Sequence, residues 1–230
     1  MGRPPASRKD YHFYGRRKGH ALSPAQKALR DTLLPGLRID PGSTIDPQEL
    51  FPEAVPQIWL EIGFGGAEHL LRQAQQNPHV GLIGVEPFIN GVIKALAGIR
   101  DAGLSNIRLY DDDVRDLLPS LKTNSIDRVF VLFPDPWPKT RHRRRRIVQH
   151  ELVDELARIM KPGGELRLAS DIPDYVDQML RLVAHHPAFE WIATDADDWR
   201  IRPNDWPETR YEAKAIREGR VPAYLRFLRR

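Results

Sequence analysis

Short apolar runs alternate with amphipathic stretches along most of the chain. Runs rich in Val, Ile and Leu predict buried strands at residues 57–62, 80–85, 106–110, 127–133 and 164–169. Segments with apolar residues at helical spacing lie between them, at residues 67–76, 88–102, 114–118 and 147–160. This order of strand and helix predicts a parallel sheet with helices on both faces.

The C-terminal third continues the pattern with a change of direction. Lys161-Pro162-Gly163-Gly164 is expected to stop the preceding helix, and Pro173 to open another helix that runs toward His185. Residues 189–194 and 209–215 are expected to pair as antiparallel strands at one edge. The predicted fold is therefore α/β, a doubly wound, mostly parallel seven-stranded sheet with an antiparallel edge. We expect residues 1–22 to be a basic, flexible arm and residues 23–230 a single domain.

Composition narrows the class of protein. A chain of 230 residues with 41% hydrophobic content can bury one substantial core. No apolar run approaches the roughly 20 residues that span a bilayer, and residues 1–20 are polar and basic, so we expect a cytoplasmic protein that does not enter membranes. With no cysteine, disulfides, thiolate zinc sites and thiol nucleophiles are excluded. The eight histidines lack paired ligand spacing, so no metal is expected.

Basic residues are concentrated in three segments, at residues 3–18, 139–146 and 217–230. If these segments meet in space, they form a surface that could follow a phosphate backbone. Arg143 to Arg146 are expected in the first turn of the helix at residues 147–160, where cations are unfavourable unless an anion compensates. A solvated basic face or a targeting run is the alternative for this cluster, and a disordered tail is the alternative for the N-terminus.

A glycine-rich turn follows the first predicted strand, with Gly63 and Gly65 leading into a helix. In such sheets ligands bind at the carboxyl ends of the strands, and glycine lets them approach the backbone. Glu86 ends the second strand, where its carboxylate could accept both hydroxyls of a ribose. The pairing predicts a nucleotide cofactor.

Charge separates two candidate cofactors, NAD and S-adenosylmethionine. A pyrophosphate at the helix N-terminus would be repelled by Glu68. S-adenosylmethionine carries a cationic sulfonium and ammonium, which tolerate or favour Glu61, Glu68 and Asp113. We therefore favour S-adenosylmethionine, with Asp113 near the adenine, while Asp111 and Asp112 are interpreted as capping and turn residues.

The segment Phe133-Pro134-Asp135-Pro136-Trp137-Pro138-Lys139 follows the fourth strand and leads into the arginine run. A carboxylate on a rigid turn beside cations suits recognition of a nucleic-acid base. Trp137 could stack on such a base or belong to the core. Arg210 and Tyr211 could complete the pocket or be ordinary residues of an edge strand.

Several segments together resemble the bacterial tRNA (guanine-N7-)-methyltransferase family, over the chain from about residue 23 to the end. They are Leu60-Glu61-Ile62-Gly63-Phe64-Gly65, Gly84-Val85-Glu86, the Pro134 to Lys139 segment with Arg141-His142 and Arg145-Arg146, Ser170-Asp171, and Thr209-Arg210-Tyr211-Glu212. The resemblance implies a Rossmann-like, class I fold that uses S-adenosylmethionine. It implies methylation of N7 of a guanosine in the tRNA variable loop, at tRNA position 46.

The resemblance also implies roles for individual residues. The cofactor would be bound by Glu61, Gly63, Gly65, Glu86, Asp113 and Asp135, with Asp135 also the catalytic residue. The tRNA would be bound by Lys139, Arg141, His142, Arg143, Arg144, Arg145, Arg146, Asp171, Thr209, Arg210, Tyr211 and Glu212. This chain has Ala67 where members of the family often have glycine, and its Arg143 and Arg144 make the run more basic than in some members.

Guanine N7 has an in-plane lone pair and needs no deprotonation, so Asp135 is better interpreted as a group that orients a reactant than as a base. Whether it faces guanine or the methionine part of the cofactor stays open. Two other functions also stay open, a non-catalytic RNA-binding protein and a methyltransferase for ribosomal RNA or a protein side chain. Pro136-Trp137 breaks the Pro-Pro-aromatic pattern usual in amino-group methylases. Monomer and homodimer are equally compatible with the sequence.

Overall fold

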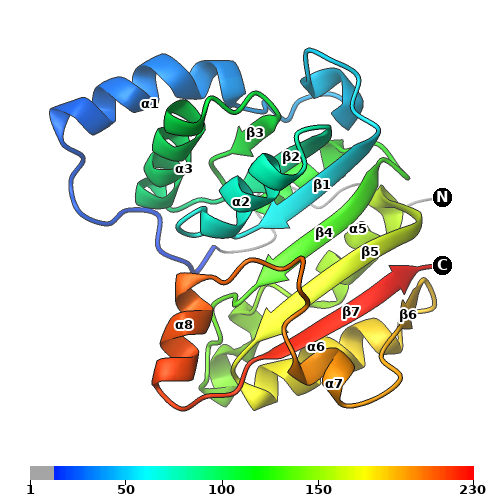
Figure 1. Cartoon of the computed structure of the whole chain (residues 1–230). Coiled ribbons are helices and arrows are strands. Elements are labelled where there is room, and N and C mark those ends of the chain that lie inside the picture. Colours follow the sequence, from blue (N-terminus) through cyan, green and yellow to red (C-terminus); the bar gives the residue numbers. More distant parts are fainter. Residues whose placement is uncertain (1–12) are drawn as a thin grey trace.

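Seven strands form one sheet in the order β3-β2-β1-β4-β5-β7-β6 (Figure 1). This computed structural model describes residues 13–230. The first five strands are mutually parallel, and β7 runs antiparallel to both β5 and β6. The predicted α/β fold, with a mostly parallel seven-stranded sheet and an antiparallel edge, is therefore confirmed.

The strands are β1 (Gln57–Ile62), β2 (Val80–Val85), β3 (Ile107–Tyr110), β4 (Ile126–Leu132), β5 (Met160–Ser170), β6 (Phe189–Trp191) and β7 (Ala223–Arg229). The helices are α1 (Pro24–Leu37), α2 (Glu68–Gln76), α3 (Ile89–Ala102), α4 (Val114–Leu117), α5 (His150–Ile159), α6 (Pro173–Ala184), α7 (Asp197–Arg200) and α8 (Arg210–Arg217). Three 3₁₀ helices are η1 (Pro47–Leu50), η2 (Leu118–Ser120) and η3 (Thr140–Arg145).

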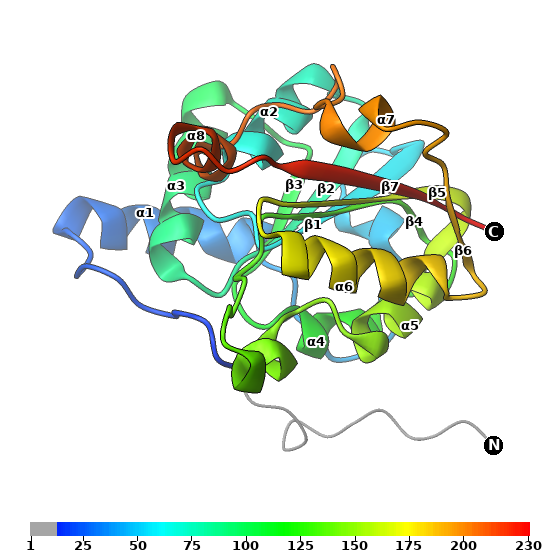
Figure 2. The same ribbon diagram turned by 90° about the horizontal axis from the view of Figure 1, so that it is seen from below.

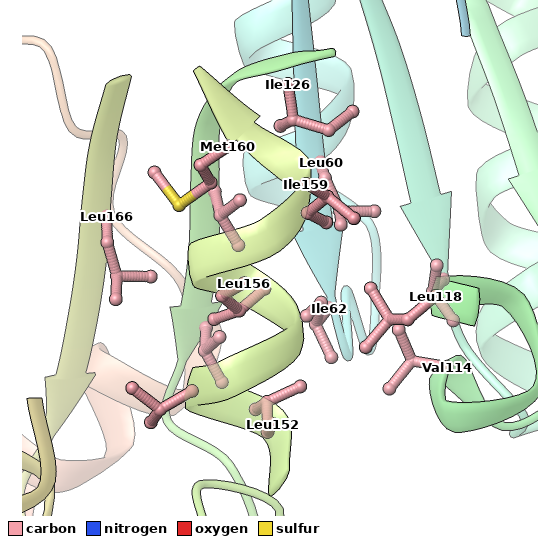
Figure 3. Close-up of a cluster of buried hydrophobic side chains, with 14 of the residues drawn as sticks. Leu60, Ile62, Val114, Leu118, Ile126, Leu152, Leu156, Ile159, Met160 and Leu166 are labelled. Carbon is pink, nitrogen blue, oxygen red and sulfur yellow. The ribbon is translucent and has the colours of Figure 1, made fainter. Parts of the chain in front are cut away.

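Helices cover both faces of the sheet, with α4, α5 and α6 on one face and α2 and α3 on the other (Figure 2). On β1, Leu60 and Ile62 point toward the first group and pack with Leu152 and Leu156 of α5 (Figure 3). Trp59, which precedes Leu60 and points to the other face of the sheet, belongs to the opposite cluster. Burial of each such side chain contributes about 1.5–3 kcal/mol, so the two clusters fix the strand ends that carry the site.

The C-terminal edge differs from the prediction. Residues 209–215 were expected to be a strand, but they form the start of α8, capped by Thr209. The Thr209 hydroxyl accepts from the Glu212 backbone N–H at 3.2 Å, and the Glu212 carboxylate accepts from the Thr209 N–H at 3.5 Å. This reciprocal capping box stabilises a helix start. The antiparallel partner of β6 is instead β7, where Phe227 lies opposite Trp191.

The arginine run also lies outside the helix that was predicted to contain it. Residues 140–145 form η3, and α5 begins only at His150. Arg143 to Arg146 therefore do not crowd the N-terminus of α5. The expectation that an anion must compensate them at a helix start is wrong, because they lie before the N-cap of α5, Gln149, and not in its first turn.

The Lys-Pro-Gly-Gly turn interrupts a strand pairing. Ile126 pairs with Met160, whereas Arg128 pairs with Glu165, so residues 161–164 leave the ladder between these two pairs. Gly163 has a φ of +79° there. Helix α5 ends at Ile159, just before this turn, as predicted. Strand β5 begins at Met160, so the turn lies within the strand and not before it.

Candidate active site

A cavity of about 670 Å³ opens at the carboxyl ends of the central strands. Its floor includes Ile62 of β1, Val85 of β2 and Leu132 of β4. The chain runs outward from β1 through β2 and β3, then returns to the other side of β1 with β4. The cavity therefore lies at the topological switch point, where doubly wound sheets bind ligands.

The glycine-rich turn after β1 forms one wall. Gly65 has a φ of +54°, and a Cβ at this position would lie 2.9 Å from the Tyr211 ring. A Cβ at Gly91 in α3 would lie 2.2 Å from the Gly65 carbonyl oxygen. Ala67 has a left-handed φ of +66°, which costs an alanine on the order of 1 kcal/mol relative to glycine. The preference for glycine at that position thus has a backbone cause.

Glu86 holds the turn from the next strand. Its carboxylate accepts from the Gly65 backbone N–H at 2.8 Å and from the Phe88 N–H at 2.9 Å. Burial raises the pKa of Glu86, the two N–H donors oppose the shift, and the charges of Asp135 and Glu61 add to it. Each carboxylate oxygen uses one lone pair on the backbone, so each retains one that could accept from a ligand hydroxyl.

Asp113 lines the cavity at the start of α4. Its carboxylate accepts from the Arg115 backbone N–H at 3.0 Å and from the Arg115 guanidinium at 2.6 and 2.9 Å. The side chain is almost fully buried. It is therefore both a helix cap and a charged wall of the cavity.

Glu61 is buried on the α2 side of the sheet, where the His69 ring Nδ1 lies 2.8 Å from its carboxylate. The Gln73 amide donates to the Asp205 carbonyl at 2.9 Å, and its nitrogen lies 3.3 Å from His69 Nε2. An amide nitrogen is only a donor, so these partners assign Nε2 as an acceptor and Nδ1–H as the donor to Glu61. Glu61 thus faces His69 rather than the cavity lining, and its cofactor role stays a prediction.

Asp135 stands on a strained turn at the cavity rim. Phe133 and Trp137, on either side of it, have φ values of +49° and +41°. Within residues 13–230 no side chain or backbone group forms a hydrogen bond or ion pair with Asp135. Asp135 is itself exposed, but the surrounding cavity walls partly desolvate its carboxylate and raise its pKa, and the charge of Arg16 opposes this shift. An unpaired carboxylate on backbone of this kind is typical of functional sites.

The basic run beyond the turn presents charge to solvent. Lys139, Arg141 and Arg144 are exposed, and no carboxylate of residues 13–230 pairs with them. Arg143 is paired with Asp174 at 2.6 Å. Lys139, Arg141 and Arg144 form a cationic rim beside Asp135.

Three further members of the run have other surroundings. His142 lies against Trp137, and burial together with the surrounding cations lowers its pKa. The Arg145 guanidinium lies between two rings, 4.6 Å from the centre of Tyr14 and 5.0 Å from that of Trp137. Arg146 is buried and paired within the protein, so in this structure it does not belong to the surface that was expected to contact RNA.

The residues near the C-terminus that were expected to hold RNA are likewise partly buried and partly exposed. Thr209 and Glu212 are buried in the capping box of α8, and Glu212 also pairs with Arg202 at 3.0 Å. Tyr211 is 46% exposed and lines the cavity. Arg210 lies beside it, with its guanidinium 5.2 Å from the centre of the Tyr211 ring. Their interpretation as edge-strand residues is wrong.

Asp171 follows β5 and is paired with Arg220. The Asp171 hydrogen bond raises the pKa of Arg220, and Glu218 adds to the shift. This pair joins the end of β5 to the segment after α8. A tRNA contact by Asp171 stays a prediction.

The segment before α1 supplies cavity residues that the sequence did not single out. Phe13, Tyr14 and Arg16 line the cavity. Arg17 pairs with Asp112 at 2.5 Å, and its carbonyl accepts from the Ile89 N–H at 3.0 Å. Aromatic residues among cations were the available signal, and they had been interpreted as a flexible arm. The part of that arm before Phe13 lies outside the described residues.

Two arginines of the third basic group, Arg226 and Arg229, lie away from the cationic rim. In the antiparallel β7, Ala223 lies opposite Ser170 beside the site, whereas Leu228 lies opposite Glu165 farther along the sheet. Arg226 is paired with Glu165, and Arg229 donates to the Ala157 carbonyl. The end of β7 is therefore remote from the cavity, and these two arginines do not extend the cationic rim.

Two searches of residues 13–230 bear on other kinds of site. They contain no group of three His, Asp or Glu side chains placed to hold a metal ion. In the same part of the chain, no helix combines the length and the apolar character needed to cross a membrane.

Solved structures with low sequence identity share the fold. The 16S rRNA methyltransferase KamB matches with a TM-score of 0.59 at 15% identity, over 82% of this chain and 96% of that one. Precorrin-6y C5,15-methyltransferase from Geobacter metallireducens matches with a TM-score of 0.52 at 14% identity, over 80% and 84%. These matches identify a Rossmann-like methyltransferase fold.

Sequence comparison gives the family. Residues 56–224 match the family described as "Putative methyltransferase". A tRNA (guanine-N(7)-)-methyltransferase from Rhodospirillum rubrum is 53% identical over 99% of this chain and 91% of its own length. One from Agrobacterium fabrum is 52% identical over 97% of each chain. The chain therefore belongs to the tRNA (guanine-N(7)-)-methyltransferase family, as its motifs had indicated.

Proposed function

We propose that this enzyme transfers a methyl group from S-adenosylmethionine to N7 of the guanosine at position 46, in the variable loop of tRNA. The observation that carries the proposal is the unpaired Asp135 carboxylate, which stands between a nucleotide-sized cavity and an exposed cationic rim. The names of the relatives support the base, the atom and the class of RNA. We further propose that the enzyme acts in the cytoplasm.

The cavity offers hydrogen-bond acceptors that suit the proposed cofactor. Glu86 retains one free lone pair on each oxygen, enough to accept from both ribose hydroxyls. The wall also carries three arginines, Arg16, Arg115 and Arg145. Of these, Arg115 neutralises Asp113. The carboxylate of Asp135 would suit the cationic sulfonium or ammonium. When bound, S-adenosylmethionine supplies an electrophilic methyl group. Glu86 and Asp113 would hold the nucleoside end at the switch point.

Asp135 and Trp137 are proposed to place the guanine. The ionised Asp135 carboxylate would accept from guanine N1–H and the N2 amino group, which fixes the plane of the base and directs N7 at the methyl group. The same negative charge would offset the positive charge that develops on the ring as N7 is alkylated. Trp137 and Tyr211, both on the cavity wall, offer rings for stacking. No proton has to leave N7 before the transfer.

Lys139, Arg141 and Arg144 are proposed to bind the phosphates that flank this base. They are exposed, close together in sequence and free of protein carboxylates among residues 13–230. Each neutralised phosphate releases counterions, so binding should weaken as salt rises. Contacts of this kind fix the register of the RNA, while the cavity identifies the base.

The proposal is tested with labelled S-adenosylmethionine and an unmodified tRNA transcript. A matched transcript made with 7-deazaguanosine replaces N7 by a carbon and retains the Watson–Crick edge. We expect label in the ordinary transcript and none in the 7-deaza transcript. Equal labelling of both would exclude N7 as the acceptor, and labelling of neither, with the cofactor bound, would direct the search to other acceptors.

A further inference from the structure

Arg146 differs from the other arginines of the basic run in its surroundings. Its side chain is fully buried, whereas Arg141 and Arg144 are exposed. A buried guanidinium is costly unless each of its N–H groups finds a partner. Because Arg146 is buried beside the candidate active site, contact with RNA does not account for this residue.

Each nitrogen of the Arg146 guanidinium has a protein partner. Nε donates to the Pro136 carbonyl at 2.8 Å, Nη1 donates to the Gln178 amide oxygen at 2.7 Å, and Nη2 donates to the Asp174 carboxylate at 2.5 Å. The guanidinium also lies over the Tyr175 ring, 4.5 Å from its centre. Arg146 thus ties the turn after β4 to the first two turns of α6.

The tied carbonyl belongs to the residue that follows Asp135 and precedes Trp137. Trp137 has a φ of +41°, a conformation that a tryptophan retains only when its surroundings hold it there. The Trp137 ring contacts Arg145 and His142, which are side chains of the exposed η3. Of the contacts described for this turn, the Arg146 hydrogen bond to Pro136 is the one that connects the turn to α6.

We propose that Arg146 is a positioning residue, which sets the Asp135–Trp137 turn at the distance and orientation that methyl transfer requires. The inference deepens the proposed function and rests on it. Arg146 acts through Pro136 and does not touch the substrate. We therefore predict that loss of the Arg146–Pro136 hydrogen bond lowers the rate of methyl transfer without weakening the binding of tRNA or cofactor.

Arg146→Lys tests this with the charge retained. A lysine ammonium lacks the planar fork and does not reach three partners in fixed directions. We expect kcat with saturating tRNA and S-adenosylmethionine to fall about 30- to 100-fold, since a misplacement of about 1 Å can cost on the order of a hundredfold. The Kd values of tRNA and cofactor should change less than about threefold. Arg181→Lys is the matched control, because Arg181 is exposed on α6, pairs with Asp177 and has no place in the site, and it should retain the wild-type kcat.

Asp174→Asn alters the partner of Arg146 on α6 and provides a second variant if Arg146→Lys does not fold. It weakens the charged partner of Arg146 with almost no change in volume, and kcat should fall in the same direction by a smaller factor. Asp177→Asn, which neutralises an exposed carboxylate on the same helix, is its control and should retain the wild-type kcat. A wild-type kcat in Asp174→Asn and Arg146→Lys would overturn the inference.

A readout independent of activity separates this inference from the proposed function. In protein labelled with fluorotryptophan, the ¹⁹F resonance of Trp137 is assigned with Trp137→Phe. We expect Arg146→Lys to shift or broaden that resonance and Arg181→Lys to leave it in place. An unchanged resonance, or a loss of activity that lies wholly in the Kd of tRNA, would overturn the inference. If the wild-type enzyme fails to methylate tRNA, the proposed function fails, whatever the resonance shows.

Discussion

Replacement of Glu86 by glutamine should weaken cofactor binding through a loss that the geometry defines. The carboxylate uses one lone pair of each oxygen on the Gly65 and Phe88 backbone N–H groups and retains one on each for a ribose hydroxyl. In Glu86→Gln one oxygen becomes an NH₂ group, which no longer accepts from a hydroxyl. A hydrogen bond to a charged group contributes about 1.5–3 kcal/mol, so the Kd of S-adenosylmethionine should rise about 10- to 150-fold.

The same substitution has two opposing effects on stability. The new NH₂ group faces a backbone N–H that has lost its acceptor, at a cost of about 1–3 kcal/mol. In the other direction, burial raises the pKa of Glu86 in the folded protein, so its ionised form destabilises the fold once the pH exceeds the unfolded pKa. Glutamine removes that penalty at neutral pH. We therefore expect a modest fall in the unfolding free energy, within about 2 kcal/mol.

Titration calorimetry with S-adenosylmethionine measures the first effect and thermal unfolding the second. Glu68→Gln is the matched control, because Glu68 is a largely exposed carboxylate beside the same turn, and its Kd should stay near that of the wild-type protein. Binding of tRNA without cofactor should be unchanged in both variants. A wild-type cofactor Kd in folded Glu86→Gln would refute the assignment of Glu86 to the ribose.

Asp135→Asn should lower kcat by about 100-fold or more with an unchanged thermal midpoint, measured by single-turnover methylation, because the amide presents donors to donors on guanine. Since burial raises the Asp135 pKa and the ionised form is required, kcat/KM of the wild-type enzyme should fall with decreasing pH through a pKa above that of ordinary aspartate; absence of this limb would contradict the role. Arg141→Ala with Arg144→Ala should weaken tRNA binding and reduce its salt slope by about two, in filter-binding titrations from low to high salt, while cofactor binding persists. His69→Asn should weaken cofactor binding if Glu61 binds the cofactor in the orientation that His69 holds; an unchanged Kd by calorimetry would leave the pair a purely structural one.

The parallel part of the fold could be predicted because each strand is a short apolar run between helical segments. Burial on both faces leaves β2 uniformly apolar, and its predicted bounds match the structure. The C-terminal edge was harder, because Thr209 to Glu212 combines β-forming residues with a capping box. The capping signal was available in the sequence and was overlooked, as was the apolar alternation of β7.

The sequence predicted which residues would gather at the candidate site, but not how all of them are arranged. The glycine turn, Glu86, Asp113 and Asp135 meet around one cavity, as expected for strand ends at a switch point. Sequence spacing does not reveal which arginine of a run turns inward, since that depends on the tertiary position of α6. For the same reason, the buried Arg146 could not be distinguished from its exposed neighbours.

The sequence pattern also could not predict that the segment before α1 lies against the cavity. Its contacts join residues far apart in the chain, such as Arg17 with Asp112 and Gly19 with Asn90. Local periodicity carries no information about pairs of this kind. The aromatic residues Phe13 and Tyr14 acquire a meaning only once the position of the cavity is known.

The measurement that tests the account most directly is a map of the methylated position at single-nucleotide resolution. An unmodified tRNA transcript is incubated with the enzyme and S-adenosylmethionine, and the chain is then cleaved chemically at 7-methylguanosine. The account predicts cleavage at one guanosine, in the variable loop at position 46, and none when Asp135→Asn replaces the wild-type enzyme under the same conditions. Cleavage at a different guanosine, or methyl incorporation without cleavage, would contradict it.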